Sequence, residues 1–116
     1  MSIERVKKYF KRFGISGRIK ELDSSSATVE LAAQALNCEP ERIAKTLAFN
    51  VNEQIVLIVT AGDAKIDNHK YKTVFGLKAK MLSPEMVENL VGHAVGGVCP
   101  FGINENIAVY LDVSLK

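Results

Sequence analysis

Hydrophobic residues at the start of the chain recur with the spacing of an amphipathic helix. They stand at Ile3, Val6, Phe10 and Phe13, and the basic residues between them fall largely on the other faces. Gly14 follows directly, and glycine is a common residue just past a helix end because it tolerates the left-handed conformation found there. The pattern therefore predicts a first helix that ends near residue 13.

A second apolar stripe, at positions 29, 32, 33 and 36, predicts a helix over about Thr28 to Leu36. The serines at positions 24 to 26 offer side-chain oxygens that could cap the first N–H groups of this helix. Pro40 suits the first turn of a brief third helix, because proline lacks the N–H that this position leaves unused. We expect the third helix to deliver Lys45 to the start of a strand.

Two apolar, β-branched runs follow, from Thr46 to Val51 and from Gln54 to Thr60. Only Asn52 and Glu53 separate them, and two residues is the length of a tight hairpin connection. Both strands should be mostly buried, since few polar residues interrupt either run.

Two further helices are predicted in the second half of the chain. One covers Ile66 to Phe75, and the other begins at Ser83-Pro84-Glu85, which supplies a cap, a first turn and an early acid, and runs to about Val91. Gly76 and Gly92 follow these helices and are expected to end them.

Two further strands complete the pattern. Leu77 to Leu82 is predicted as a short strand, and Ile107 to Leu115 alternates apolar and more polar residues, so one of its faces should lie in the core. Helices thus mix with hairpin-connected strands and do not alternate strictly with them. The sequence predicts a single α+β domain with a mainly antiparallel or mixed, curved sheet and flanking helices.

Composition agrees with one soluble globular domain: of 116 residues, 47% are hydrophobic and 24% are charged. No run approaches the roughly 18 apolar residues of a membrane-spanning helix, and the first residues lack the apolar stretch of a secretory signal. Cys38 and Cys99 are too few for a disulfide framework, so both are expected to be free thiols. We therefore expect a cytoplasmic protein without membrane contact.

The charge of the chain is unevenly distributed. The formal net charge is only +2, yet seven of the fifteen basic residues lie in the first twenty positions, where Glu4 is the only acid. A basic surface of this kind can bind the phosphates of a nucleic acid, and it is also typical of a solvated helix face. Four of these residues on the first helix are the candidate nucleic-acid-binding residues: Lys7, Lys8, Lys11 and Arg12.

A glycine-rich loop closed by proline is the strongest candidate site in the sequence. It reads Gly96-Gly97-Val98-Cys99-Pro100. Glycines let backbone N–H groups approach a ligand closely, and proline restricts the shape of the loop. From these residues alone, an ordinary tight connection remains the alternative interpretation.

Three segments taken together resemble the YbaK-like family of prolyl-tRNA editing domains, which are free-standing aminoacyl-tRNA deacylases. They are Ala44 to Phe49, which contains Lys45-Thr46-Leu47, then Thr60 to Asp67, and then the loop Gly96 to Gly102. The resemblance covers about Leu22 to Leu115 and implies an α+β fold. Family members usually continue for several tens of residues beyond this point, with a Ser/Gly-containing segment that helps wall the pocket. We therefore expect either a compact version of the domain or a partly missing pocket.

The resemblance also implies roles for individual residues. Lys45 would hold the phosphate or ribose side of the terminal nucleotide, with the 2′-hydroxyl of the substrate assisting hydrolysis and neither metal nor cofactor required. Backbone groups of the loop would bind the aminoacyl carbonyl or stabilise the oxyanion. Thr46 alternates to the other face of an ideal strand, so its pocket role requires a local twist. The implied substrate-binding residues are Thr46, Gly96, Gly97, Val98, Cys99 and Pro100.

Other chemistries have weaker support. Cys99 as a nucleophile would need His93 as its base, and nothing in the six-residue spacing predicts a contact between them, so Cys99 is expected to shape the pocket wall. The two histidines and two cysteines show no zinc-ligand spacing. Asp63, Lys65 and Asp67 are either a polar rim or, as we expect, part of a helix-capping turn.

The sequence therefore leads to one principal function and two alternatives. The principal interpretation, which rests on the resemblance, is a trans-acting deacylase of misacylated tRNA, with tRNA(Pro) carrying cysteine or alanine as the expected substrate and prolyl-tRNA synthetase as a candidate partner. The alternatives are a non-catalytic module that binds tRNA or a synthetase, and an esterase for another small acyl compound. Which amino acid is removed depends on about 1 to 3 kcal/mol of packing and stays open at this point.

Overall fold

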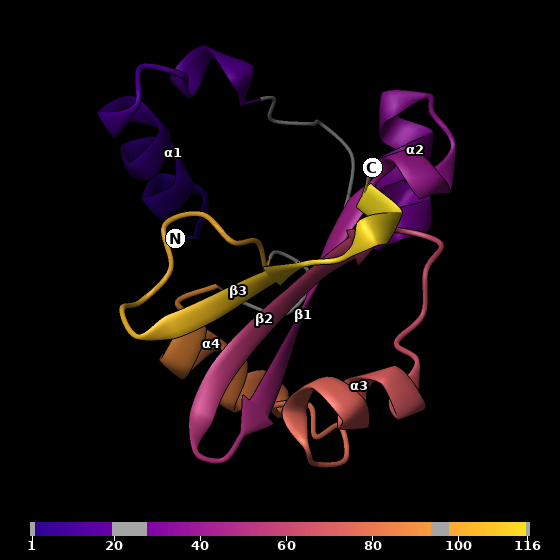
Figure 1. Ribbon diagram of the computed structural model, residues 1–116. Helices are drawn as coiled ribbons and strands as arrows, with labels where there is room; N and C mark the ends of the chain where they lie inside the picture. Colours follow the sequence, from indigo (N-terminus) through magenta and orange to yellow (C-terminus); the bar gives the residue numbers. More distant parts are fainter. Residues whose placement is uncertain (1, 20–27, 94–97, 116) are drawn as a thin grey trace.

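The computed structural model describes residues 2–19, 28–93 and 98–115. Four helices and three strands lie in these ranges (Figure 1). In chain order they are α1 (Ser2–Arg12), α2 (Val29–Leu36), β1 (Ala44–Val51), β2 (Gln54–Ala61), α3 (Asn68–Phe75), α4 (Pro84–Val91) and β3 (Ile107–Leu111), with single 3-10 turns at Ser16–Arg18, Pro40–Arg42 and Val113–Leu115.

The sheet is mixed and has the order β1-β2-β3. Strands β1 and β2 are antiparallel and form the predicted hairpin, whereas β3 is parallel to β2. Asn52 and Glu53 both have positive φ, at 53° and 69°, as the two-residue hairpin turn that matches strand twist requires. The predicted α+β domain with a mixed sheet is confirmed.

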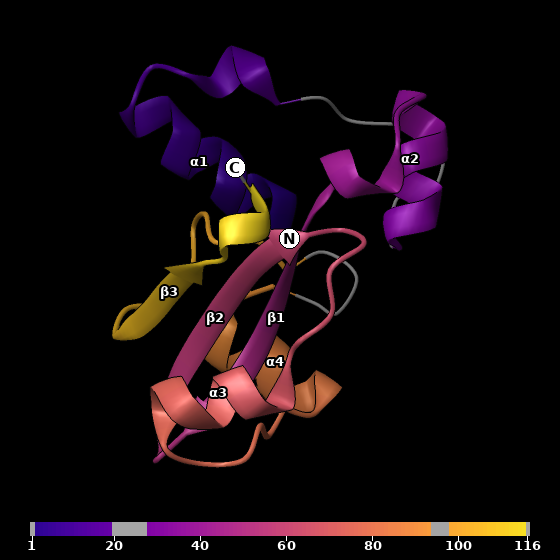
Figure 2. The ribbon, with the colours of Figure 1, turned by 45° about the vertical axis from the view of Figure 1, so that its right-hand side comes forward.

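Helices cover both faces of the sheet, with α3 on one face and α4 on the other (Figure 2). Leu57 of β2, which is fully buried, packs in one core cluster with Val87 and Val91 of α4. Its neighbours Val56 and Ile58 face the other way, into a cluster with Tyr71 of α3. The nearly uninterrupted apolar sequence of β2 follows from this burial on both faces.

The helices begin and end at residues suited to those positions. Asp67 and Ser83 cap the first N–H groups of α3 and α4, as the sequence predicts. Helix α2 is capped by Thr28, whose hydroxyl accepts from the N–H of Leu31 at 3.1 Å, so Thr28 provides the cap that the sequence analysis assigned to the serines at 24 to 26, which lie outside the described residues. Gly76 and Gly92 end α3 and α4 with positive φ.

Two strand predictions are wrong in part. Leu77 to Leu82 forms only a single bridge, between Met81 and Phe49 of β1. The strand predicted over Ile107 to Leu115 ends at Leu111. The predicted core face is present at Ile107, which packs against the cluster of Leu57, but Leu111 and Val113 are 71% and 76% exposed. The reason is the edge position of β3 in the sheet: helix α3 contacts this strand through the ring of Phe75 on Tyr110, a residue outside the alternating apolar set.

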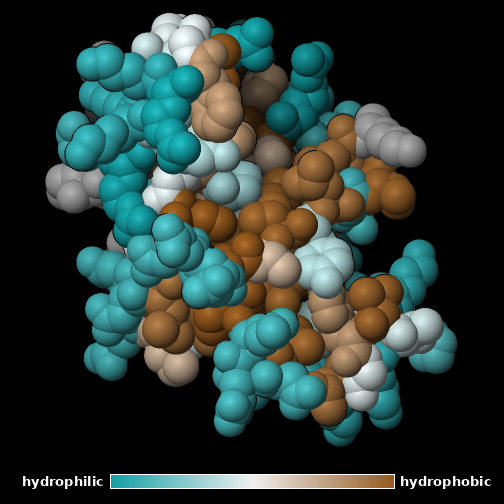
Figure 3. Space-filling view, turned by 60° about the vertical axis from the view of Figure 1, so that its left-hand side comes forward, coloured by the Kyte–Doolittle hydropathy of each residue, from teal (hydrophilic) through white to brown (hydrophobic). Residues whose placement is uncertain are grey.

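Exposed hydrophobic side chains, Leu111 and Val113 among them, make part of the surface apolar. Hydrophobic side chains gather in the middle of the face that Figure 3 presents, with hydrophilic side chains around them. Among the described helices, none is long and apolar enough to cross a membrane.

Candidate functional site

A cavity of about 390 Å³ lies along the outer edge of β1. Consecutive residues of the chain line it from Ile43 to Ala48, so residues of both strand faces reach the same space. The remaining walls come from the first turns of α2 and α4, from residues directly before these two helices, and from one residue after α4. They are Thr28, Val29, Ala32, Met81, Leu82, Pro84, Val87 and Val98.

Lys45 is the only charged residue among the described residues that line this cavity. Its side chain is half-buried at the beginning of β1, where the 3-10 turn Pro40–Arg42 leads into the strand. An ammonium group on an otherwise mostly apolar wall favours an anion in the cavity, because the charge has little other polar surface to contact.

The beginnings of two helices reinforce this positive potential. Thr28, the residue that caps the start of α2, and Pro84, the first residue of α4, both line the cavity. The free N–H groups of a helix start carry a partial positive charge. The cavity is therefore suited electrostatically to a phosphate, a carboxylate or a developing oxyanion next to Lys45.

Three of the predicted site residues meet in this cavity: Lys45, Thr46 and Val98. Thr46 reaches the cavity without the local twist that the sequence analysis required, since the cavity borders the strand edge and is open to both faces. Gly96 and Gly97 lie outside the described residues. Cys99 and Pro100 are half-buried and are not among the residues that line the cavity.

Cys99 and His93 are in contact, which the sequence spacing did not predict. The Cys99 Sγ lies 3.7 Å from His93 Nε2 and 3.6 Å from the carbonyl oxygen of Phe101. The loop folds back on itself after Pro100, so the carbonyl of Phe101 comes to lie 2.7 Å from His93 Nε2.

This contact does not activate the thiol. A ring nitrogen at 2.7 Å from a carbonyl oxygen must carry the proton and donate it, so Nε2 has no lone pair with which to accept the proton of Cys99. Burial also raises the pKa of the Cys99 thiol, which keeps it in the less nucleophilic form. The geometry favours a packing role for Cys99, and His93, which is fully buried, ties the two ends of the loop together.

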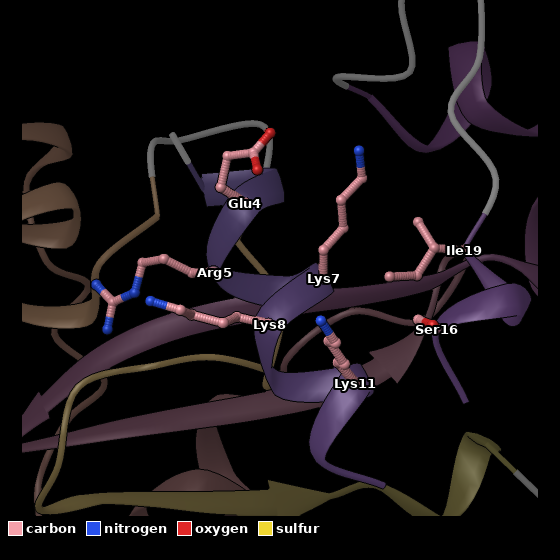
Figure 4. A pocket seen from close by; sticks show the side chains of 7 residues that line it. All are labelled: Glu4, Arg5, Lys7, Lys8, Lys11, Ser16 and Ile19. Atoms are coloured by element: carbon pink, nitrogen blue, oxygen red, sulfur yellow. The ribbon is translucent and has the colours of Figure 1, made fainter. Parts of the chain in front are cut away.

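The predicted tRNA-binding lysines line a second, separate hollow, of about 800 Å³. It lies between α1 and the Ser16–Arg18 turn, and Lys7, Lys8 and Lys11 project from α1 around it, with Arg5 and Lys8 extending in one direction and Lys7 in another (Figure 4). Arg12 is exposed and does not line the hollow.

Arg5 is a residue that the sequence analysis missed. Its guanidinium Nη2 donates to Asn104 Oδ1 at 2.8 Å. The guanidinium lies against Gly92 and the backbone carbonyl of Arg5 lies against Gly102, so a Cβ atom at either glycine would collide with Arg5. Asn104 in turn donates to the carbonyl oxygens of Asn89 and Leu90 at the end of α4. Arg5 therefore fastens the basic helix to the segment that follows the glycine-rich loop. Gly102 was the available signal in the sequence, because Gly92 is already accounted for as the residue that ends α4.

Among the described residues, no group of three or more histidine, cysteine or acidic side chains is arranged to hold a metal ion. Asp63 and Lys65 are exposed, and Asp67 acts as the cap of α3 as expected, with the N–H of Lys70 lowering the pKa of its carboxyl group. The fold and the cavity thus define a small α+β domain with a mostly apolar cavity beside Lys45 at the outer edge of its sheet.

Comparison with known proteins identifies which domain this is. The model of the aminoacyl-tRNA editing domain matches residues 23–116. Uncharacterized protein YwhH of Bacillus subtilis is 50% identical over the whole of this chain, which covers 74% of that protein. A proline–tRNA ligase of Bacillus cytotoxicus is 34% identical over 85 residues, 72% of this chain and 15% of the ligase.

A solved structure agrees with these sequence matches. A candidate trans-editing enzyme for prolyl-tRNA synthetase superposes with a TM-score of 0.86 at 33% identity, over 97% of this chain and 72% of its own. The chain belongs to the aminoacyl-tRNA editing domain family.

Proposed function

We propose that this protein is a trans-acting deacylase that hydrolyses the ester of misacylated tRNA, with tRNA(Pro) as the expected carrier. The observation that carries the proposal is the cavity in which Lys45 and Val98, from two widely separated segments of the chain, lie together. The similarity to a proline–tRNA ligase and to a candidate trans-editing enzyme supports the choice of tRNA.

The chemistry asked of the protein is modest. The aminoacyl group is joined to a ribose hydroxyl by an ester, water adds to its carbonyl carbon, and the ribose oxygen leaves with a proton. One preorganised donor at the oxyanion contributes roughly 3 to 4 kcal/mol to lowering the barrier. We propose backbone N–H groups of Gly96, Gly97 and Val98 as these donors, and the 2′-hydroxyl of the substrate as the group that orients the water.

Lys45 is proposed to hold the terminal nucleotide of the tRNA. Its ammonium group would contact the phosphate or ribose side of the terminal adenosine, at a place where two helix beginnings also favour negative charge. None of these steps uses a metal ion or a cofactor, so we expect activity to survive a chelator.

The mostly apolar lining of the cavity suits a small side chain such as that of alanine or cysteine. Val29, Ala32 and Val87 offer it no charged partner. Lys7, Lys8, Lys11 and Arg12 are proposed to contact the tRNA backbone outside the cavity. A prolyl-tRNA synthetase is the proposed protein partner, since it produces the mischarged tRNA.

The test is deacylation of a panel of mischarged tRNAs, with Lys45→Ala as the site variant and Lys72→Ala, an exposed lysine on α3, as its matched control. We expect Lys45→Ala to slow hydrolysis at least about tenfold, equivalent to about 1.4 kcal/mol, and Lys72→Ala to leave it unchanged. A folded protein that binds these tRNAs but hydrolyses none would instead be a binding module. Hydrolysis of simple acyl esters without tRNA dependence would indicate a general esterase.

A further inference from the structure

The outer edge of β1 is only half covered. Near the hairpin, the N–H of Leu82 donates to the carbonyl oxygen of Ala48 at 3.1 Å, and the N–H of Asn50 donates to the carbonyl oxygen of Lys80 at 2.9 Å. The backbone groups of Ala48 and Asn50 therefore face away from β2. Because alternate residues of a strand direct their N–H and C=O groups to opposite sides, Thr46 faces the same way as Ala48.

Among the residues that the structure describes, this edge meets the cavity at Thr46 and no further strand. β1 pairs with β2 on its inner side, and the bridge at Met81 reaches only as far as Phe49 and its neighbours. Within the described part of the chain, no backbone group bonds to the outward N–H or C=O of Thr46. A donor and an acceptor thus stand side by side on the wall of the cavity, one residue from Lys45.

An aminoacyl ester presents the complementary pair of groups. Its α-ammonium is a donor and its ester carbonyl is an acceptor, on adjacent carbons, as the N–H and C=O are in one residue of a β-strand. Main-chain pairing to an exposed sheet edge is a general way to bind an extended peptide.

We propose that the aminoacyl group of the substrate pairs with Thr46 as a single added strand residue. The α-ammonium donates to the carbonyl oxygen of Thr46, and the N–H of Thr46 donates to the ester carbonyl. This inference rests on the proposed function and adds the means by which the acyl group is recognised. It makes the free α-amino group a requirement and leaves the amino acid side chain to the apolar walls.

The hydrogen bond from the N–H of Thr46 to the ester carbonyl is tested by replacing this N–H with an oxygen atom. Thr46→Val removes the side-chain hydroxyl but keeps the N–H, and α-hydroxyisovaleric acid placed at position 46 by cell-free translation gives the same side chain with an ester oxygen in place of the N–H. The probe is a hydrolysis-resistant analogue, 3′-deoxy-3′-(L-alanylamido)adenosine, with binding measured by calorimetry. We expect the hydroxy-acid protein to bind it at least about tenfold more weakly than Thr46→Val.

Folding must be checked in the same proteins. The carbonyl of Lys45 becomes an ester carbonyl in the hydroxy-acid protein, and it faces β2 opposite Thr60, so the sheet is slightly weakened. Thermal unfolding of both variants gives the folded fraction at the temperature of the binding assay, and affinities are compared per folded molecule.

The hydrogen bond from the α-ammonium to the carbonyl oxygen of Thr46 is tested by changing the ligand. The lactyl counterpart of the adenosine analogue has a hydroxyl in place of the α-ammonium, and we expect the unmodified protein to bind it at least about tenfold more weakly. Equal affinities of the two position-46 proteins, or equal affinities of the alanyl and lactyl ligands, would overturn the pairing. Failure of the analogue to bind at all would overturn it too.

Hydrolysis of mischarged tRNA is measured separately. Absence of hydrolysis together with the expected binding differences would refute the deacylase proposal and leave the pairing intact. Hydrolysis without those binding differences would refute the pairing with Thr46 and support the deacylase proposal.

Discussion

Gly62, directly after β2, gives a sharp test of how the cavity wall is built. A Cβ atom at this position would lie 2.6 Å from Val29 Cγ1 and 2.8 Å from the carbonyl oxygen of Ile43, and closer still to the carbonyl oxygen of Pro40. Two of these atoms belong to the backbone and cannot rotate away. Gly62→Ala must therefore displace the Pro40–Arg42 turn or the start of α2.

The magnitude follows from two opposing effects. Overpacking a well-packed site costs about 1 to 3 kcal/mol. Alanine also restricts the unfolded chain, which stabilises a protein by about 0.4 to 1 kcal/mol where the backbone conformation permits it. Gly62 is not among the positive-φ residues, so no backbone strain is added. The net loss of unfolding free energy should be about 1 to 2 kcal/mol.

The assay is thermal and urea unfolding followed by circular dichroism, with Gly17→Ala as the control. Gly17 also lacks a positive φ, and in the described structure a Cβ atom added there would have no other atom within 4 Å, apart from its own chain neighbours. At about 4 °C per kcal/mol, Gly62→Ala should lower Tm by about 4 to 8 °C, and Gly17→Ala should leave it unchanged or raise it. Equal stability of the two variants would refute the steric argument. Since Val29 and Ile43 also line the cavity, Gly62→Ala should raise KM for deacylation as well.

Three other predictions concern Lys45, the basic face of α1 and Cys99. Lys45→Arg should also lose most deacylase activity, since a broad planar guanidinium replaces a compact ammonium poorly; near-normal kcat/KM in this variant would argue against a tight phosphate contact. Replacing Lys8 and Lys11 by Glu should weaken tRNA binding and flatten its dependence on salt without changing Tm, measured by filter binding at several salt concentrations; an unchanged slope would show that the helix is only solvated. Cys99→Ser should keep most hydrolysis, and loss of single-turnover hydrolysis in the folded variant would favour covalent catalysis. Because burial raises the pKa of the Cys99 thiol, iodoacetamide should modify Cys99 more slowly at pH 8 than it modifies free N-acetylcysteine.

Local sequence signals predicted the local structure well. Pro84 after a capping serine, Gly76 and Gly92 each fix a helix end through their own backbone preferences, and these are readable without tertiary information. The hairpin was equally readable, because two apolar runs separated by Asn52 and Glu53 leave room for only one kind of connection.

Features that depend on tertiary position could not be predicted from the sequence. Alternation in Ile107 to Leu115 indicates a strand with two unlike faces, yet whether a helix covers the apolar face depends on where the strand lies in the sheet, and Leu111 is left exposed. The meeting of Cys99 with His93 requires the loop to fold back after Pro100, which no spacing rule predicts.

The candidate site was predicted in part for the same reason. Lys45 and Thr46 stand out as a polar pair before an apolar strand, and the family resemblance links them to the loop of Val98. The outward direction of the Thr46 backbone groups follows only from the bonds of Ala48 and Asn50 to the segment before α4, so it required the structure.

The contacts of Arg5 with Gly92, Gly102 and Asn104 limit how the basic helix can be re-engineered. Helix α1 is held through Arg5, whose guanidinium lies against Gly92 and whose backbone carbonyl lies against Gly102. Transplanting α1 onto another editing domain to change its tRNA preference would thus fail unless the recipient also has small residues at both places and an amide like that of Asn104. Helix α1, the end of α4 with Gly92, and the segment with Gly102 and Asn104 must therefore be exchanged together.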